Sequence, residues 1–579
     1  MPCNEIIQSN NTYDVIIPLD ALERVLQKPA CIQHINRSYD IYYFGRDTVP
    51  PLGFEDYTYS SIPKCFGLLD TSALEESGIL QLQQNPALAL YGQGVLVGFV
   101  DTGIAYENKC FRSADGSTRI AAIWDQTAAP AGEDILEESE AGSVFHAPEG
   151  FEYGTEYTRE DINRALRSEN PREIVPQQDT DGHGTLLSSI ACGSEDESGG
   201  FVGAVPYSEL LVVKLKPAKQ YLKDFFYIPQ SAVVYQENDI MAAIAYLDKK
   251  AREMGRPLVI CLALGTNNGS HSGGSVLSEY LDEIGALWYR CIVIATGNEA
   301  NARHHFFGTS NARWNNGGIG GQADAIEINV EENMQGFYLE LWGTAPELFA
   351  VSVRSPGGVL LPQAATRAGS HQEYLFVFEN TRVEIDYRSV GRIRRNQLVF
   401  IRFSGASRGI WTVNVFPASG LPGSFHAWLP MTGMLPNDVF FLKSNPDVTL
   451  TIPSTASVPV TVGGYNSSNG ALYQDSGRGF TTANVVKPDF NAPAVRVQGV
   501  DTRGNYTTGS GTSVAAAIAT GACVQLMEWG VVRKNADPLN SVDIGNILIR
   551  GCKRDSDRIY PNTEWGYGKL DAFGAFQML

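Results

Sequence analysis

The stretch Val95–Gly103, VLVGFVDTG, decides the fold class, because an uncharged apolar run leads directly into an Asp-Thr-Gly turn. A short continuous apolar run predicts a strand buried on both faces, as in parallel sheets. Similar runs occur at Glu209–Val213, Leu258–Leu264 and Cys291–Ala295, and Asp239–Met254 has helical spacing. Strands that alternate with helices predict an α/β fold, a parallel sheet covered by helices on both faces.

Composition excludes several classes of protein. The chain has 579 residues, of which 43% are hydrophobic and 19% charged, and this predicts several folded units rather than a disordered or fibrous chain. The net charge of −20 repels phosphate backbones and anionic lipids, so we expect no nucleic-acid partner. No apolar run approaches 18 residues, which predicts no membrane span.

The N-terminal sequence and the cysteines point to a reducing compartment. The first residues lack the basic and apolar regions of a signal peptide, so we expect an intracellular protein. The chain has nine cysteines, an odd number that cannot all pair within one chain, and no two of them form a CxxC pair. We therefore expect reduced, mostly buried thiols.

The patterning divides the chain into four segments. Residues 1–66 read as a small α+β unit, with strands at Tyr13–Pro18 and Ser38–Phe44 around a helix at Asp20–Gln27 whose Asp20 and Glu23 have capping-box spacing. Residues 67–300 and 454–579 carry the α/β pattern. Residues 301–453 contain short alternating strands without a convincing helix, which predicts an inserted all-β sandwich or jelly roll.

Four polar residues stand at the ends of predicted elements. Asp101 follows the strand that ends at Val100, Asn298 follows the strand that ends at Ala295, and His183 and Ser513 each begin a helical stretch. Each also has an ordinary structural explanation, as an Asx turn, a Gly-Asn turn, a helix cap or a surface residue. Together they supply a nucleophile, a base, an orienting carboxylate and an amide donor.

The chain order Asp, His, Ser is that of subtilisin among triad proteases. The sequence resembles the subtilases from about Gly92 to Glu299 and from about Ser454 to Phe576. Gly203–Leu215 is similar to the family's GVAP strand, and Lys487–Pro493 (KPDFNAP) to its approach to the serine. The sequence departs from the family at HGTLL, which begins with His183 and replaces the common HGTHV, and at VAAAIAT after Ser513, which replaces MAAPHVA.

The resemblance implies roles for individual residues. Ser513 would be the nucleophile, His183 the general base and then acid, Asp101 the group that orients the imidazole, and Asn298 an oxyanion-hole donor. Leu262–Thr266 (LALGT) is similar to the strand that pairs with the substrate backbone. Ala263, Leu264 and Gly265 would therefore bind substrate, with Ala263 replacing the usual serine.

The resemblance also implies maturation. Residues 1–66 resemble a subtilase propeptide, which would be cut between Tyr57 and Ser72 by the protein itself and stay bound without a covalent link. The whole layout is similar to the clostridial Csp germination proteases. That subgroup implies limited proteolysis of a spore cortex hydrolase zymogen by an intracellular or spore-associated bacterial enzyme.

Alternatives remain open at this point. One is a catalytically idle pseudoprotease that acts as a binding or signalling protein. Another is a carbohydrate-binding role for the insertion, although Trp342, Trp411 and Trp428 are expected in its core. We expect no required cofactor; calcium is common in the family, but no acidic cluster here has diagnostic spacing, and Glu133–Glu140 reads as a solvated surface insertion.

Overall fold

The computed structural model describes residues 3–18, 28–68, 77–129, 146–196, 200–310, 312–315, 318–321, 324–364, 366–391, 396–418, 421–436 and 438–579. The helix predicted at Asp20–Gln27 and the acidic stretch Glu133–Glu140 lie outside these residues.

An eight-stranded sheet forms the centre of the fold, in the order β26-β25-β12-β10-β5-β8-β6-β7. Every pair is parallel except β6 with β7. Its strands are β5 (Leu96–Asp101), β6 (Ile120–Asp125), β7 (Thr155–Thr158), β8 (Glu209–Lys214), β10 (Leu258–Leu262), β12 (Arg290–Ala295), β25 (Val460–Tyr465) and β26 (Phe490–Pro493). The predicted parallel α/β sheet is confirmed, although the apolar run to Leu264 divides: Leu264–Gly265 is a separate strand, β11, in another sheet.

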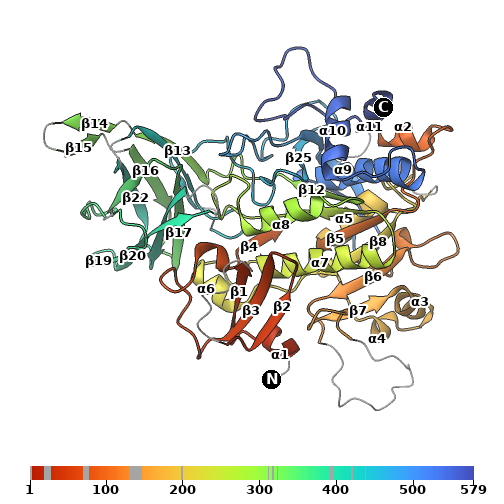
Figure 1. Ribbon diagram of the computed structural model, residues 1–579, viewed down its shortest axis with the longest axis horizontal. Coiled ribbons are helices and arrows are strands. Elements are labelled where there is room, and N and C mark those ends of the chain that lie inside the picture. Colours follow the sequence, from red (N-terminus) through yellow and green to blue (C-terminus); the bar gives the residue numbers. More distant parts are fainter. Residues whose placement is uncertain are drawn as a thin grey trace.

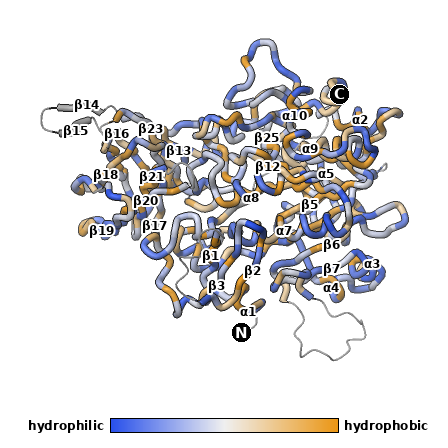
Figure 2. The backbone as a smooth tube through the Cα atoms, in the orientation of Figure 1, coloured by the Kyte–Doolittle hydropathy of each residue, from blue (hydrophilic) through white to orange (hydrophobic). Residues whose placement is uncertain are grey.

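Helices cover both faces of this sheet (Figure 1). On β5, Val97 and Phe99 share a core with α5 (His183–Cys192) and α9 (Thr512–Met527). The alternate residues Leu96 and Val100 share the other core with α7 (Glu237–Glu253) and α8 (Val276–Gly285). This alternation explains the continuous apolar run in the sequence, because both faces of the strand are buried. Figure 2 shows apolar residues concentrated along the central strands.

Shorter elements complete this core. They are α2 (Ile79–Gln84), α3 (Arg159–Arg167), α4 (Pro171–Ile174), α6 (Gln220–Phe225), α10 (Ser541–Gly551), α11 (Ala572–Gln577) and the hairpin of β27 (Val495–Val500) and β28 (Tyr506–Ser510). The helical stretch Thr512–Val532 has the length and apolar composition of a membrane span, but 94% of its apolar window is buried inside the fold. It has the surroundings of a core helix.

The N-terminal segment forms its own antiparallel sheet, β1-β3-β2, with the short helix α1 (Cys3–Gln8). Its strands are β1 (Thr12–Pro18), β2 (Cys31–His34) and β3 (Tyr39–Gly45). Cys3 and Cys31 form a disulfide, so the expectation of reduced thiols is wrong for these two residues. The other seven cysteines are free and buried, as expected.

A buried charge fastens the N-terminal sheet to the core. Asp14 of β1 is fully buried and forms an ion pair with Lys219, and it also accepts a hydrogen bond of 2.6 Å from Gln236. Removing one partner of such a pair leaves an uncompensated buried charge, which is strongly destabilising. The contact therefore fixes where the N-terminal sheet docks.

Two antiparallel sheets make up the segment between β12 and β25, at one end of the molecule (Figure 1). They enclose a hydrophobic core of their own, which contains Trp411 as predicted. Trp342 and Trp428 are also buried, but in the cluster of the main core, so the prediction is wrong for these two residues. The larger sheet contains β13 (His305–Ser310), β17 (Gly336–Gly343), β19 (His371–Phe376), β20 (Thr381–Val390), β21 (Asn396–Ser404) and β23 (Gly423–Trp428). The smaller contains β16 (Asp324–Val330), β18 (Phe349–Arg354), β22 (Gly409–Pro417) and β24 (Val439–Phe441), and β14 (Ala312–Asn315) pairs with β15 (Gly318–Gly321). The jelly-roll strand order stays a prediction.

A stack of histidines lies where this segment meets the core. The His271 ring lies 4.0 Å from that of Trp428, and its two nitrogens contact the carbonyl oxygens of Leu450 and Asn267. The ring nitrogens of His305 and His426 are 2.9 Å apart. Burial lowers the pKa of His271 and of His426 to about 4.

We expect acidification to destabilise the protein through these histidines. An unfolded histidine has a pKa near 6.5, so the unfolded chain binds more protons than the fold between pH 6.5 and 4, and stability falls as the pH drops through this window. Between pH 7 and pH 5, proton uptake by each of His271 and His426 in the unfolded chain should lower the free energy of unfolding by about 2 kcal/mol. Urea titrations at both pH values measure the loss. The His426→Gln variant should lose less, and an equal loss in both proteins would contradict this assignment.

Candidate active site

Asp101 and His183 meet at the carboxyl end of the central sheet. Asp101 is the last residue of β5, and His183 is the first of α5. Nδ1 of His183 lies 2.9 Å from both carboxylate oxygens, and the two residues are only 2% and 9% exposed. An ionised carboxylate only accepts hydrogen bonds, so the imidazole proton sits on Nδ1 and Nε2 is the basic nitrogen.

Neighbouring residues hold this pair in place. The backbone N–H of Thr102 donates to Asp101 at 2.7 Å, and the Thr102 hydroxyl accepts from the N–H of Gly184 at 3.0 Å. A side chain at position 184 would collide with the carbonyl oxygen of Gly103, so only glycine lets the helix approach the strand this closely.

Asp179 organises the start of α5. Its carboxylate accepts from the N–H of Gly182 at 2.8 Å, and from the N–H and hydroxyl of Thr185 at 2.9 and 2.6 Å. These bonds satisfy backbone donors that a helix start leaves unpaired. Asp179 and Thr102 were not predicted as site residues; the signal for Asp179 is its place four residues before His183.

Ser513 is the second residue of α9, which begins at the same edge of the sheet. Its side chain is fully buried, and Oγ makes no hydrogen bond to any residue in the described part of the chain. The preceding Gly511 has φ of +143°, a conformation that favours glycine. At a helix start the Ser513 N–H has no partner within the helix, so it is free to donate.

Asn298 is oriented by the residue before the serine. The N–H and the hydroxyl of Thr512 both donate to Asn298 Oδ1 at 3.2 Å, and the same hydroxyl accepts from the N–H of Gly297 at 3.2 Å. Because the amide oxygen is engaged, the amide NH₂ of Asn298 points away from Thr512 and can donate elsewhere. The four predicted residues therefore lie at one edge of the sheet, at the ends of β5 and β12 and the starts of α5 and α9.

A segment of the chain itself lies along the predicted substrate-binding strand. The strand β4 (Cys65–Leu68) pairs antiparallel with β11, with Leu68 opposite Leu264 and Gly67 opposite Gly265. Its other edge pairs with β9 (Tyr235–Gln236). Leu264 and Gly265 thus bind an extended backbone, while Ala263, directly before β11, is buried.

Glu340 joins three distant segments beside this strand. Its buried carboxylate accepts from the hydroxyl of Tyr59 at 2.8 Å, the amide of Asn268 and the N–H of Gly269 at 2.9 Å, and the indole N–H of Trp342 at 2.9 Å. Burial raises the pKa of Glu340, and these donors oppose that rise. The segment that leads into β4 is therefore tied to both the core and the inserted sheets.

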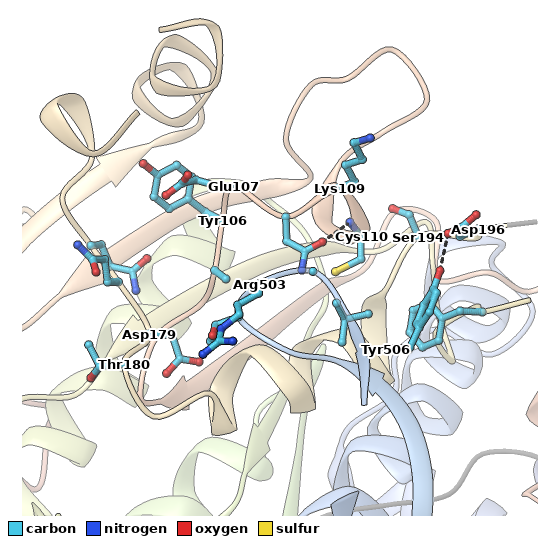
Figure 3. Close-up of a pocket in the computed structure, with 18 of the residues that line it drawn as sticks. Tyr106, Glu107, Lys109, Cys110, Asp179, Thr180, Ser194, Asp196, Arg503 and Tyr506 are labelled. Carbon is cyan, nitrogen blue, oxygen red and sulfur yellow. Dashed lines mark hydrogen bonds between the residues drawn. The ribbon is translucent and has the colours of Figure 1, made fainter. Parts of the chain in front are cut away.

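A cavity of about 1210 Å³ is lined by Asp179, which organises the start of α5, but by none of the four predicted catalytic residues (Figure 3). Its lining comes from stretches near these residues in sequence: residues 105–110 after Asp101, 177–180 before His183, and Thr502, Arg503, Gly504 and Tyr506 before Ser513. Tyr506 donates a hydrogen bond to Asp196 across one wall. Acidic and basic side chains both line it, among them Glu107, Asp179, Asp196, Lys109, Arg172 and Arg503.

One group of potential metal ligands occurs among the described residues, far from this site in the inserted sheets: His371, Glu373 and Glu384. Glu373 pairs with Arg382 and Glu384 with Arg402, each at 3.2 Å. Carboxylates already neutralised by arginine do not fit a cation, so we assign no metal there.

Comparisons with known proteins identify the family of this chain. The profile of the Subtilase family, Peptidase S8, matches residues 92–325 and 436–568, more than half of the chain. The structure of the Clostridium perfringens CspB protease is 29% identical, covers 87% of this chain and 96% of its own, and has a TM-score of 0.73. An S41 psychrophilic protease is 14% identical, covers 86% of this chain and has a TM-score of 0.40. No curated protein sequence matches significantly. The chain belongs to the subtilase family and is a subtilisin-like serine peptidase.

Proposed function

We propose that this protein is an endopeptidase in which Ser513, His183 and Asp101 act as a catalytic triad. The contact of His183 Nδ1 with both oxygens of Asp101, at 2.9 Å, carries the proposal. Nε2 takes the Ser513 proton as Oγ attacks the substrate carbonyl, and later gives it to the leaving amine. Water then releases the acyl group by the same route, while Asn298 and the Ser513 N–H stabilise the oxyanion.

The N-terminal segment acts, in this proposal, as a propeptide that the protein cuts and retains. Its strand β4 lies along β11 as a bound substrate strand would, which supports this function. Because pairing continues to Leu68, we place the cut after Leu68, within the predicted window that ends at Ser72. Asp14 and Tyr59 would keep the segment bound through their contacts with Lys219 and Glu340.

The biological role proposed here is limited proteolysis of a spore cortex hydrolase zymogen during germination. The likeness to the CspB protease over most of both chains supports it. The enzyme would act inside a bacterial cell or in its spore, with a protein substrate and without nucleic acid or a required cofactor.

Side-by-side expression of wild type and Ser513→Ala tests the proposal. We expect wild type to divide into two chains with a new N-terminus between residues 69 and 72, and the variant to stay whole at 63.0 kDa. Intact mass spectrometry measures the size of each chain, and N-terminal sequencing locates the new N-terminus. If a folded wild type stays whole, the pseudoprotease alternative replaces the triad, and if both proteins are cut alike, an outside protease does the cutting.

Replacing Asn298 by alanine should lower kcat by about 10²- to 10³-fold with little change in KM. The variant lacks one hydrogen-bond donor to the oxyanion, and that hydrogen bond forms only in the transition state. Peptide hydrolysis kinetics measure this. Thr512→Val keeps the amide donor and removes one of the bonds that orient it, so its loss should be smaller. An unchanged kcat in Asn298→Ala would remove Asn298 from the oxyanion hole.

A further inference from the structure

A second pair of a buried carboxylate and a histidine follows Asn298 directly. Glu299 and His304 are only 2% and 4% exposed, and Nδ1 of His304 donates to the Glu299 carboxylate at 2.8 Å. Burial alone would raise the pKa of Glu299, but the contacts with His304 and Thr432 outweigh it, so the pKa lies below its ordinary value. An ionised carboxylate therefore lies inside the fold, one residue from the predicted oxyanion donor.

The Glu299 carboxylate joins three other segments of the chain. It accepts a hydrogen bond from the side-chain amide of Asn267 and another from the backbone N–H of Thr432, each at 3.0 Å. Asn267 lies shortly after β11, while His304 and Thr432 belong to the early and late parts of the inserted segment. The Asn267 amide also donates to the carbonyl oxygen of Leu429 at 3.2 Å, and the Leu429 N–H donates to that of His304 at 2.9 Å. Two distant parts of the insertion therefore meet at this one carboxylate.

Glu299 supplies the side-chain anchor of the turn that carries Asn298. Gly297, on the other side of Asn298, is held through its backbone alone, and its φ of +88° lies in the region that favours glycine. Thr512 binds the amide oxygen of Asn298, but the amide can donate only from where its own backbone places it. A donor to the oxyanion acts at about 3 Å from the developing charge, so a small displacement of this turn weakens it.

We propose that Glu299 is a positioning residue for the oxyanion hole, through which the inserted segment holds the Asn298 amide in place. The inference rests on the proposed function and gives the insertion a part in it. When Glu299 loses its hydrogen bonds, the turn relaxes and the amide no longer points accurately at the oxyanion. Misplacing a catalytic group by about 1 Å lowers turnover by up to about a hundredfold.

Glu299→Gln tests the proposal, because it keeps the size of the side chain and turns one acceptor oxygen into a donor. That new donor faces the donors of Asn267, His304 or Thr432, so at least one hydrogen bond is lost. We expect kcat for a fluorogenic peptide to fall by about ten- to a hundredfold, while KM changes by less than about threefold.

Glu528→Gln is the matched control. Glu528 is also 2% exposed, and its carboxylate accepts from the backbone N–H of Gly92 at 2.6 Å and forms an ion pair with Arg533. It follows the last residue of α9, whereas Ser513 lies in the first turn of that helix. The control should lower the melting temperature but leave kcat within about twofold, because the site is remote. An equal fall of kcat in both folded variants would mean that lost stability causes it, which overturns the positioning role.

A double variant separates positioning from other roles. If Glu299 acts through the Asn298 amide, Glu299→Gln should lower kcat by less than about twofold in the Asn298→Ala background. Losses that multiply, or an unchanged kcat in Glu299→Gln, would overturn the role of Glu299 and leave the peptidase intact. If Glu299→Gln does not fold, His304→Asn removes the ring and keeps an amide donor, and the same comparison applies with a smaller expected loss. No hydrolysis by wild type would overturn the proposed function itself.

Discussion

Replacing Ser513 or His183 by alanine is expected to lower peptide turnover by about 10⁶-fold, and replacing both should cost no more than either alone. The serine hydroxyl is a weak nucleophile until Nε2 of His183 removes its proton. Neither side chain therefore contributes to turnover without the other. What remains in each variant is catalysis by the oxyanion donors and by substrate binding.

The three variants are compared by hydrolysis of one fluorogenic peptide and by the fraction of self-cleaved chain after prolonged incubation. Thermal melting checks that each is folded, since the His183 variant leaves a buried carboxylate without its partner. If the losses in the two single variants multiplied in the double variant, the residues would act independently, which contradicts a triad.

Asp101→Asn is expected to lower turnover by about 10⁴-fold while the fold stays intact. The asparagine amide can donate to Nδ1, which would then lack its proton, so the imidazole would carry the proton on Nε2. In that tautomer Nε2 cannot accept the proton of Ser513. The shape of the site changes little, because the two side chains have nearly the same size.

Asp181→Asn is the matched control for this prediction. It removes the same charge from an exposed residue whose carboxylate, among the residues that the structure describes, accepts a hydrogen bond only from the His183 backbone N–H, at 3.3 Å. We expect a change of less than about tenfold in kcat, in line with weak exposed electrostatics. Similar losses in both variants would mean that Asp101 acts through its charge alone and not by setting the tautomer.

Periodicity predicted the elements that carry the site, but not the contacts that complete it. The runs ending at Val100 and Ala295 are strands because both their faces are buried, and the polar residues after them reach one sheet edge. The pairing of Cys3 with Cys31 was missed because sequence alone does not fix which cysteines meet. Glu340 was missed because a glutamate among alternating apolar residues normally faces solvent.

Thr451 shows the limit of sequence patterns most clearly. It comes after the whole inserted segment, and its neighbours Gly265 and Gly297 come before that segment. Nothing in its local sequence predicts that it returns to pack against these two glycines. Only the tertiary arrangement, with Ile452 bonded to Thr266, brings the three together.

The strand β4 has a consequence for any other ligand of the groove. A segment tethered beside its own binding site is present there at an effective concentration on the order of millimolar, whatever the amount of protein in the cell. A free peptide of affinity similar to that of β4 therefore occupies the groove only when it is supplied at a comparable concentration. Inhibitor screens on the uncut protein would consequently measure an affinity far lower than the affinity of the same inhibitor for a groove without β4.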